Sequence, residues 1–360
     1  MMRNSSWKRF SYSALLPFLA ICSGLLVSSL FLLMRGSSPI EAYSVMFKTG
    51  FSCLKQTNCN LFQTLQLATP LILTGLSAVM AFRSGMFSIG QEGQFLIGAT
   101  IAAWLGYAVH LPSLPHILLI IVASMAGAGI YGWIPAILKV RLNVNEVIST
   151  IIFNSLANLF MTYIVNYPFR ADQGTTAHSP IINETAFLEP FFRGAKFGPG
   201  FIIALVVAAL VFIYLWKSSL GYEQRMSGQS PRFAKYCGIK NGQAALRGMV
   251  FSGAIAGLAG AIEVLGVHHR IMQGFSSGLG FDGVMVAILG MSHPIGVAIV
   301  AIFFAGMRLG AQIGLQAVMQ IPRELGGGII ALIILFVSSQ NIFRGFLDRL
   351  FRRQSNQTDR

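Results

Sequence analysis

Charged side chains are scarce in this sequence. Asp, Glu, Lys and Arg make up only 11% of its 360 residues, whereas a soluble domain carries about 25%. Hydrophobic residues account for 54%, and the mean hydropathy is +0.66. A single hydrophobic core cannot bury so much apolar surface. Uncharged runs long enough to span a bilayer also recur along the chain. These features argue against a large soluble protein and predict a membrane protein that crosses the bilayer many times.

Motifs for metal, thiol or nucleotide chemistry are also missing. The sequence has four cysteines but no Cys-x-x-Cys pair and no Cys/His cluster with zinc spacing. It contains no Gly-x-x-x-x-Gly-Lys-Ser/Thr phosphate loop, no His-Glu-x-x-His motif and no Gly-x-Ser-x-Gly motif. We therefore expect no metal, no cofactor and no catalytic site on this chain. Cys53 and Cys59 are compatible with a disulfide or with two free thiols.

The positive charge has a distribution that is typical of membrane proteins. The formal net charge is +14, but Lys and Arg lie at the ends of apolar runs rather than on one basic face interleaved with aromatics. We therefore expect a lipid bilayer, not nucleic acid, as the partner of these charges. With the N-terminus inside, 17 basic residues fall on the cytoplasmic side and 8 on the other, with Arg308 left out inside a span. This bias predicts cytoplasmic N- and C-termini and an even number of spans.

Apolar windows predict an all-α polytopic membrane protein with about ten transmembrane helices, some of them broken. The expected domains are a cytoplasmic N-terminus at 1–11, one permease domain at 12–341 and a basic cytoplasmic C-terminus at 342–360. The first apolar run lacks a signal-peptide cleavage site and is interpreted as a span. The eighth span is too short for a plain crossing, so it is broken or re-entrant. The predicted spans are 12–33, 63–82, 93–109, 115–138, 144–166, 200–216, 246–267, 281–291, 295–310 and 325–341.

Three loops stand out between these spans. Two long outer loops, 36–60 and 167–200, are solvated connectors or docking surfaces for an external partner. An inner loop at 217–247 is polar, basic and rich in glycine, and it divides the chain into two repeat-like halves. Each half contains a glycine-interrupted polar stretch, GMFSIGQEGQ from Gly85 and GFSSGLGFDG from Gly274. Paired interrupted segments in two halves indicate a transporter with its binding site between them.

Two carboxylates lie in these stretches. Glu92 is flanked by glycines that let the backbone unwind, and a carboxylate at such depth normally faces a cavity or a partner. The alternative is that Glu92 only caps a helix in a cytoplasmic turn. Asp282 opens the short eighth span, where it caps the helix, hydrogen-bonds a hydroxyl-bearing solute, or does both. Glu263 is expected to pair with a nearby His268, His269 or Arg270.

Uncharged amides and small residues complete the pattern. Asn154 lies in the middle of a span, where it favours an interhelical hydrogen bond. Gln312, Gln316 and Gln320 share one helix face, where they bind a neutral polar solute or join helices. Gly306, Gly310 and Gly314, and Gly253 with Gly257, favour close helix packing. We hypothesise one mid-membrane route for the solute, lined by Phe87, Ser88, Gln91, Glu92, Asn154, Phe281, Asp282, Gln312 and Gln316.

Several segments resemble a known family. LATPLILTGLSAVMAFRSGMFSIGQEGQ from Leu67, NVNEVISTIIFN from Asn143, GFDGVMVAILGMSHPIG from Gly280 and the tail from Gln320 to Ser338 are similar to bacterial ABC-importer permeases for nucleosides. These permeases belong to the branched-chain amino acid and simple-sugar permease superfamily, and the resemblance is strongest to guanosine-type permeases. It implies an import subunit in the bacterial cytoplasmic (inner) membrane. Simple sugars such as ribose remain the alternative cargo.

The resemblance extends to the inner loop. Relatives carry there a short coupling helix that docks on the ATPase subunit, although Met226, Ser227 and Cys237 depart from the small apolar residues that are usual. The resemblance implies an ATP-binding-cassette ATPase, a second permease chain and an extracytoplasmic solute-binding protein as partners. A secondary transporter that works without an ATPase would need more titratable groups inside the membrane. In the inner loop, the residues of this sequence that match the coupling segment of the relatives are Arg225, Gly228, Pro231, Tyr236, Gly238 and Ile239.

Overall fold

The computed structural model of the chain describes residues 23–24, 26–30, 32–33, 37–53, 60–171, 177–191, 197–320, 322, 325–329 and 331–332. The chain forms two compact units. The central unit runs from Cys53 to Ala305, and the terminal unit combines the residues up to Ser52 with those from Gly306 onward. Each unit is described here by itself. The predicted tails at 1–11 and 342–360 lie outside the described residues.

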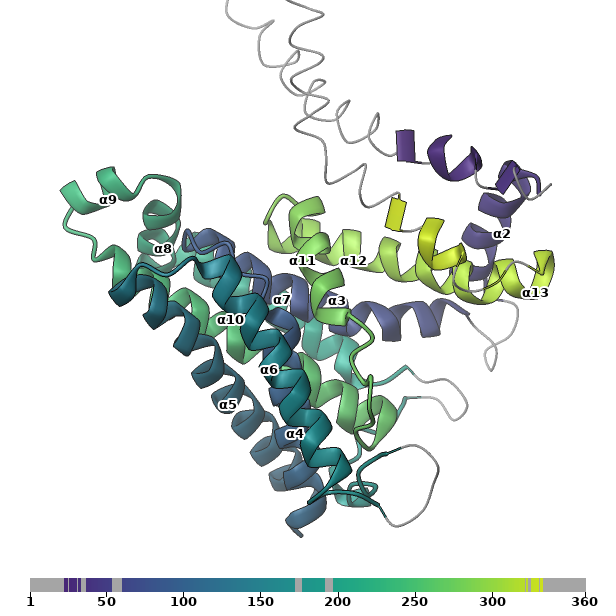
Figure 1. The fold of residues 1–360 in the computed structure, drawn as a ribbon, viewed down its shortest axis with the longest axis horizontal. Helices are drawn as coiled ribbons and strands as arrows, with labels where there is room; N and C mark the ends of the chain where they lie inside the picture. Colours follow the sequence, from purple (N-terminus) through teal and green to yellow (C-terminus); the bar gives the residue numbers. More distant parts are fainter. Residues whose placement is uncertain are drawn as a thin grey trace, which may run out of the picture. The chain divides into compact units, whose positions relative to one another are not determined.

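Helices make up nearly all the regular structure of the described residues, and no strand occurs among them (Figure 1). An isolated antiparallel bridge joins His178 to Met272. The helices are α2 (Pro39–Phe51), α3 (Asn60–Arg83), α4 (Gln91–Ala108), α5 (Ser113–Leu142), α6 (Glu146–Asn166), η2 (Glu184–Ala186), α7 (Pro199–Lys217), α8 (Ser219–Gln229), α9 (Pro231–Tyr236), α10 (Asn241–Glu263), η3 (Val264–His268), α11 (Leu279–Leu289), α12 (Pro294–Leu309), η4 (Gly310–Gly314) and α13 (Leu315–Met319).

Helices α3 and α10 form the centre of the central unit. About three quarters of their apolar windows are buried, 78% for α3 and 72% for the helix from Asn241 to His268. The corresponding fractions are only 28% for α5, 28% for α6 and 22% for α7. These three helices are apolar on their outward faces as well, which is the composition that lipid contact requires. The core is therefore built by α3 and α10, and the apolar surface around it suits a bilayer.

Small residues let α10 approach its neighbours closely, as the glycine spacing predicts. A Cβ at Gly253 would lie 2.9 Å from the Cα of Gly129 on α5, and one at Gly260 would lie 2.7 Å from the backbone nitrogen of Ala99 on α4. Neither contact leaves room for a side chain, so backbone packs on backbone. In Figure 1, α10 accordingly runs alongside α5 and α4. In the terminal unit, Gly310 packs in the same way against α2.

The span after α10 is broken. α10 passes into the π-helix η3, residues 269–278 are not helical, and α11 has only 11 residues. The non-helical backbone is paired by the loop at 177–191: the N–H of Ser179 donates to Ile271 O at 2.9 Å, and the N–H of Ile182 donates to His269 O at 2.9 Å. These hydrogen bonds satisfy backbone groups that have no partner inside a helix. The structure thus agrees with the expected short helix at this place, and its position in the bilayer stays a prediction.

Six helices among the described residues are long and apolar enough to cross a membrane. The expected total of ten and the division into two repeat-like halves stay predictions, because spans 12–33 and 325–341 lie largely outside the described residues. The ninth span differs from its prediction of 295–310: one helix runs from Pro294 to Met319. The helix continues through the π-helix η4, past the glycines and glutamines whose polarity ends the apolar run in the sequence.

Candidate functional site

Glu92 is the centre of the candidate site. It lies in the first turn of α4 and is 8% exposed. Its Oε1 accepts a hydrogen bond from the hydroxyl of Ser276, and its Oε2 accepts one from the backbone N–H of Gly280 at 2.8 Å. Both donors belong to the second glycine-interrupted stretch. The tertiary structure therefore brings the two stretches together, as the route hypothesis requires.

The sequence around α11 explains why a distant carboxylate is needed there. α11 follows Gly278, which adopts the left-handed conformation with φ 83° and offers no capping side chain. The first N–H groups of a helix have no partner inside the helix, and they favour negative charge. Glu92 supplies the missing cap from α4. A Cβ at Gly280 would lie 2.7 Å from Glu92 Oε2, so only glycine allows this approach.

Asn154 holds the start of α4 from the other side. Its Nδ2 donates to Ile89 O at 2.8 Å, and its Oδ1 accepts from the N–H of Gly93 at 2.8 Å. Asn154 lies on α6 and is 5% exposed. This is the interhelical hydrogen bonding that its mid-span position favours. α4 is thus fixed at its first turn by α6 on one side and by α11 on the other.

Three further residues predicted to line the route come just before Glu92 in the sequence: Phe87, Ser88 and Gln91. Ser88 is buried and accepts from the N–H of Gly90 at 3.1 Å. Gln91 is fully buried, and neither atom of its amide has a partner in the described part of the chain. Phe87 is exposed and stacks on Phe82, with ring centroids 4.9 Å apart. A buried amide without partners is costly, so Gln91 is a polar group whose hydrogen-bonding needs the described residues do not meet.

The beginning of α11 presents two more residues of the predicted route. Phe281 is 39% exposed, and Asp282 is partly buried one position further along the helix. Gln312 and Gln316 belong to η4 and α13 in the terminal unit, and their place on the route stays a prediction. Ser276 is a contact that sequence reasoning missed, because nothing in the stretch distinguishes it from Ser277.

The inner loop forms two short helices, α8 and α9, and α8 packs directly on the segment that leads into α4. A Cβ at Gly228 would lie 2.6 Å from Arg83 O and 2.8 Å from the backbone nitrogen of Gly85. Gly85 has φ +79°, so it turns the chain immediately after α3. The side chain of Gln224 donates to Met80 O at 2.7 Å. The loop is therefore joined through α8 to the turn between α3 and α4.

The predicted coupling residues divide between two surfaces. The guanidinium of Arg225 lies over the ring of Trp216 on α7, 5.4 Å from the ring centroid. Tyr236, in contrast, is 92% exposed, and Pro231 opens α9 at the surface. The turn after α9 completes the motif: Gly238 has φ +79°, and the N–H of Ile239 donates to Ala234 O at 2.9 Å. Arg225 and Gly228 thus contact other parts of the central unit, whereas Pro231 and Tyr236 are exposed at the surface.

A cluster of cations and aromatic rings surrounds Trp216. Arg83 also lies over its ring, at 5.3 Å, and donates through Nε to Ser292 O at 2.9 Å. The ring of His293 lies 4.8 Å from that of Trp216. Burial, and after it the positive charge of Arg83, lower the pKa of His293 below its ordinary value of 6.5. The histidine is therefore neutral near pH 7.

Comparison with known proteins identifies the family. The family described as branched-chain amino acid transport system / permease component matches residues 60–338. The chain belongs to this permease family. Together with the six apolar helices, membership makes the permease a multi-pass membrane protein. No solved structure matches the chain.

Three relatives of the permease are similar along nearly their whole length. The guanosine ABC transporter permease protein NupP of Bacillus subtilis is 35% identical over 352 residues, which are 97% of this chain and 99% of the relative. The nucleoside ABC transporter permease protein NupB of Lactococcus lactis is 30% identical over 347 residues, 93% of each chain. The glucose ABC transporter permease protein TsgB13 of Haloferax volcanii is 27% identical over 340 residues, 92% of this chain and 88% of the relative.

Metal chemistry finds no support in the described part of the permease. Within it, no group of three or more His, Cys, Asp or Glu side chains could hold a metal ion. Cys237 is free and exposed, and Cys53 is disulfide-bonded. Cys59, one of the two residues for which the sequence leaves a disulfide or free thiols open, lies outside the described residues.

Proposed function

We propose that this permease is the membrane-spanning subunit of an ABC importer that carries a nucleoside into the cell across the cytoplasmic membrane. The observation that carries the proposal is the likeness to two nucleoside permeases over more than nine tenths of the chain. Its polar residues fit such a cargo, because neutral amides, hydroxyls and aromatic rings bind a neutral solute with hydroxyl groups and a flat base.

In this proposal the solute passes beside the junction of α4 and α11. Glu92 holds the junction, and the exposed ring of Phe281 and the unpartnered amide of Gln91 supply stacking and hydrogen bonds. Half-helices that begin at membrane depth expose N–H groups where a polar solute can use them. Asp282 lies at the same helix start and bonds a hydroxyl group of the solute.

Coupling to ATP follows from the position of α8. An ATPase partner docks on the exposed surface of α9 around Tyr236, and α8 transmits its motion through the contact of Gly228 with Gly85. The turn that begins at Gly85 leads within seven residues to Glu92, and through Glu92 to α11. Motion at the loop therefore reaches both sides of the proposed route. A second permease chain and an external solute-binding protein complete the importer.

A simple sugar is the second candidate cargo, and the relative that is a glucose permease favours it. Uptake of labelled guanosine, inosine and ribose by cells with and without the gene tests the proposal. We expect ATP-dependent nucleoside uptake that disappears with the gene and with an inactive ATPase partner. If cells without the gene lose only ribose uptake and keep nucleoside uptake, the cargo is a simple sugar. Nucleoside uptake that persists without the gene, or without the ATPase, would contradict the proposal.

A further inference from the structure

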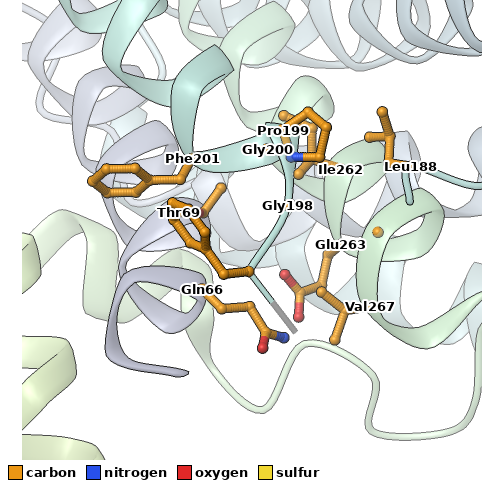
Figure 2. Close-up of a pocket in the computed structure, with 12 residues that line it drawn as sticks. Gln66, Thr69, Leu188, Gly198, Pro199, Gly200, Phe201, Ile262, Glu263 and Val267 are labelled. Carbon is orange, nitrogen blue, oxygen red and sulfur yellow. The ribbon is translucent and has the colours of Figure 1, made fainter. Parts of the chain in front are cut away.

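A pocket opens at the opposite end of the central unit from α8 and α9. It lies between α3, the start of α7 and the end of α10 (Figure 2). Three polar side chains line it, Gln66 and Thr69 from α3 and Glu263 from α10. None of the proposed route residues does, so this pocket is a separate site. Figure 2 shows the amide of Gln66 and the carboxylate of Glu263 turned toward the same space.

Glu263 is a buried acid with little compensation. It is 6% exposed, and its ion-pair partner is His268, whose Nε2 lies 3.4 Å from Oε1. The predicted pairing with His268 is thus confirmed, but the distance is longer than a strong charge-assisted hydrogen bond. No hydrogen bond reaches the carboxylate or the side chain of Gln66 from the described residues. A buried carboxylate is costly without donors, and hydroxyl groups of a ligand that enters the pocket can supply them.

The local backbone also marks this place. α10 changes into the π-helix η3 immediately after Glu263, and π-helical turns occur frequently at functional sites. The opposite wall is the first turn of α7, which has Gly198 at its N-cap position and no capping side chain. Apolar groups form the rest, including the ring of Phe197, which stacks on Phe62 with centroids 5.3 Å apart. The pocket thus combines a hydrogen-bonding edge with an apolar wall.

We propose that this pocket binds the vicinal diol of a pentose ring, with the carboxylate of Glu263 accepting hydrogen bonds from the two hydroxyl groups. Gln66 donates and accepts at the same edge, and the apolar wall covers the C–H face of the sugar. The enclosed space is about 20 Å³, which is enough for a hydroxyl group but not for a ring, so the diol meets the carboxylate at the mouth of the pocket and the remainder of the solute stays outside. The diol belongs to a nucleoside or to a free pentose. This inference rests on the proposed function and places a first solute contact at the end remote from the ATPase loop.

A cation is a poorer occupant. Hard cations take about six to eight oxygen ligands, whereas Gln66, Thr69 and Glu263 are the only described residues with polar side chains that line this pocket. His268 would also repel a cation whenever it is protonated. Hydroxyl groups satisfy the carboxylate without adding charge. They are therefore the donors that fit.

Protection from thiol labelling tests the inference on the complete importer in nanodiscs. A Val267→Cys reporter in the pocket is labelled with a maleimide, and modification of residue 267 is measured by mass spectrometry. Inosine, ribose and their 2-deoxy counterparts are the competitors. We expect inosine and ribose to slow the labelling of residue 267. The 2-deoxy compounds should need about tenfold higher concentration to give the same protection, because each lacks one hydroxyl group and therefore one hydrogen bond to the charged carboxylate. Glu263→Gln should remove the difference, whereas Glu184→Gln, an exposed carboxylate at the same end, should preserve it.

Each outcome has a defined meaning. Protection by inosine alone assigns the diol to a nucleoside, and protection by ribose alone assigns it to a free pentose. Equal protection by ribose and 2-deoxyribose, unchanged protection in Glu263→Gln, or protection by sodium chloride alone overturns the inference. Gln66→Ala, which leaves the acid in place, should weaken protection and replaces Glu263→Gln if that variant fails to insert. Inosine uptake measured in parallel separates the two proposals: uptake without protection overturns only the pocket, and protection without uptake overturns only the nucleoside cargo.

Discussion

Glu92 caps a helix that lies 188 positions further along the chain: its Oε2 accepts the N–H of Gly280 at 2.8 Å. The same carboxylate accepts the hydroxyl of Ser276. One side chain thereby ties the start of α4 to the start of α11, and the two interrupted stretches become one junction. The importer's proposed route depends on this joint.

Replacing Glu92 should loosen the junction. In Glu92→Gln one acceptor becomes a donor, which leaves a buried N–H or hydroxyl unsatisfied at a cost of about 1–3 kcal/mol. We expect a lower thermal unfolding temperature in detergent and a loss of most nucleoside uptake. Ser276→Ala removes a single donor and should have a smaller effect in the same direction. Asp282→Asn serves as the matched carboxylate-to-amide change, and it should alter uptake or selectivity while stability is kept. Wild-type uptake and selectivity in the Glu92→Gln, Asp282→Asn double variant would eliminate both roles.

The contact between α8 and the turn after α3 should transmit the action of the ATPase. Gly228→Val places a branched side chain where even a Cβ lies 2.6 Å from Arg83 O, so α8 must move away. We expect ATP hydrolysis by the assembled importer to continue while uptake falls at least about tenfold, since the ATPase still docks on α9. Gly327→Ala, which adds a methyl group where nothing lies within 4 Å, is the control for a glycine change. Normal uptake in well-inserted Gly228→Val would show that this contact is not part of the coupling.

The exposed face of α9 should govern docking itself. Tyr236 is 92% exposed, so Tyr236→Ala removes no internal packing, yet it deletes a large aromatic contact of the kind that dominates interfaces. We expect weaker co-purification of the ATPase and an unchanged unfolding temperature of the permease. Tyr163→Ala, at a 60% exposed position on α6, is the matched control. Equal retention of the ATPase by both variants would place the docking surface elsewhere.

His293 should make stability depend on pH. Its pKa is lowered by burial and by Arg83, so the folded chain takes up its proton at lower pH than the unfolded chain does. The histidine's contribution to stability is complete above 6.5 and declines as pH falls below that value. The charge of Arg83 adds to the cost of protonating the partly buried ring. We expect the unfolding temperature to fall between neutral pH and about pH 5. His293→Asn should flatten this slope, whereas exposed His110→Asn should not.

Thiol labelling tests whether Cys59 is the disulfide partner of Cys53. Cys53 is bonded and Cys237 is free and exposed, so a maleimide should react with Cys237 at once and with Cys53 only after reduction. If Cys59 is the partner, Cys59→Ser should make Cys53 reactive without reductant. Continued protection of Cys53 in that variant would contradict the pairing.

Composition and periodicity alone determined much of this protein. The scarcity of charge and the length of the apolar runs required a bilayer, because no soluble core could bury that surface. Glycine spacing predicted close helix packing, and the structure shows it where α10 meets α5 and α4. The short apolar run before Gly290 also predicted a broken span, because 11 residues cannot cross a bilayer.

Only the tertiary structure decided which partners the polar groups have. Glu92 could cap its own turn or reach a distant segment, and the choice depends on how α4 and α11 pack, which no local pattern encodes. The same holds for Ser276, whose sequence environment matches that of Ser277, and for Glu263, whose burial depends on α3 and α7. Hydrogen bonds within helices are local and follow from sequence, whereas contacts between helices are set by the simultaneous packing of the whole bundle. The sequence therefore predicts a membrane protein, whereas only the tertiary structure shows the junction at Glu92 and the pocket at Glu263.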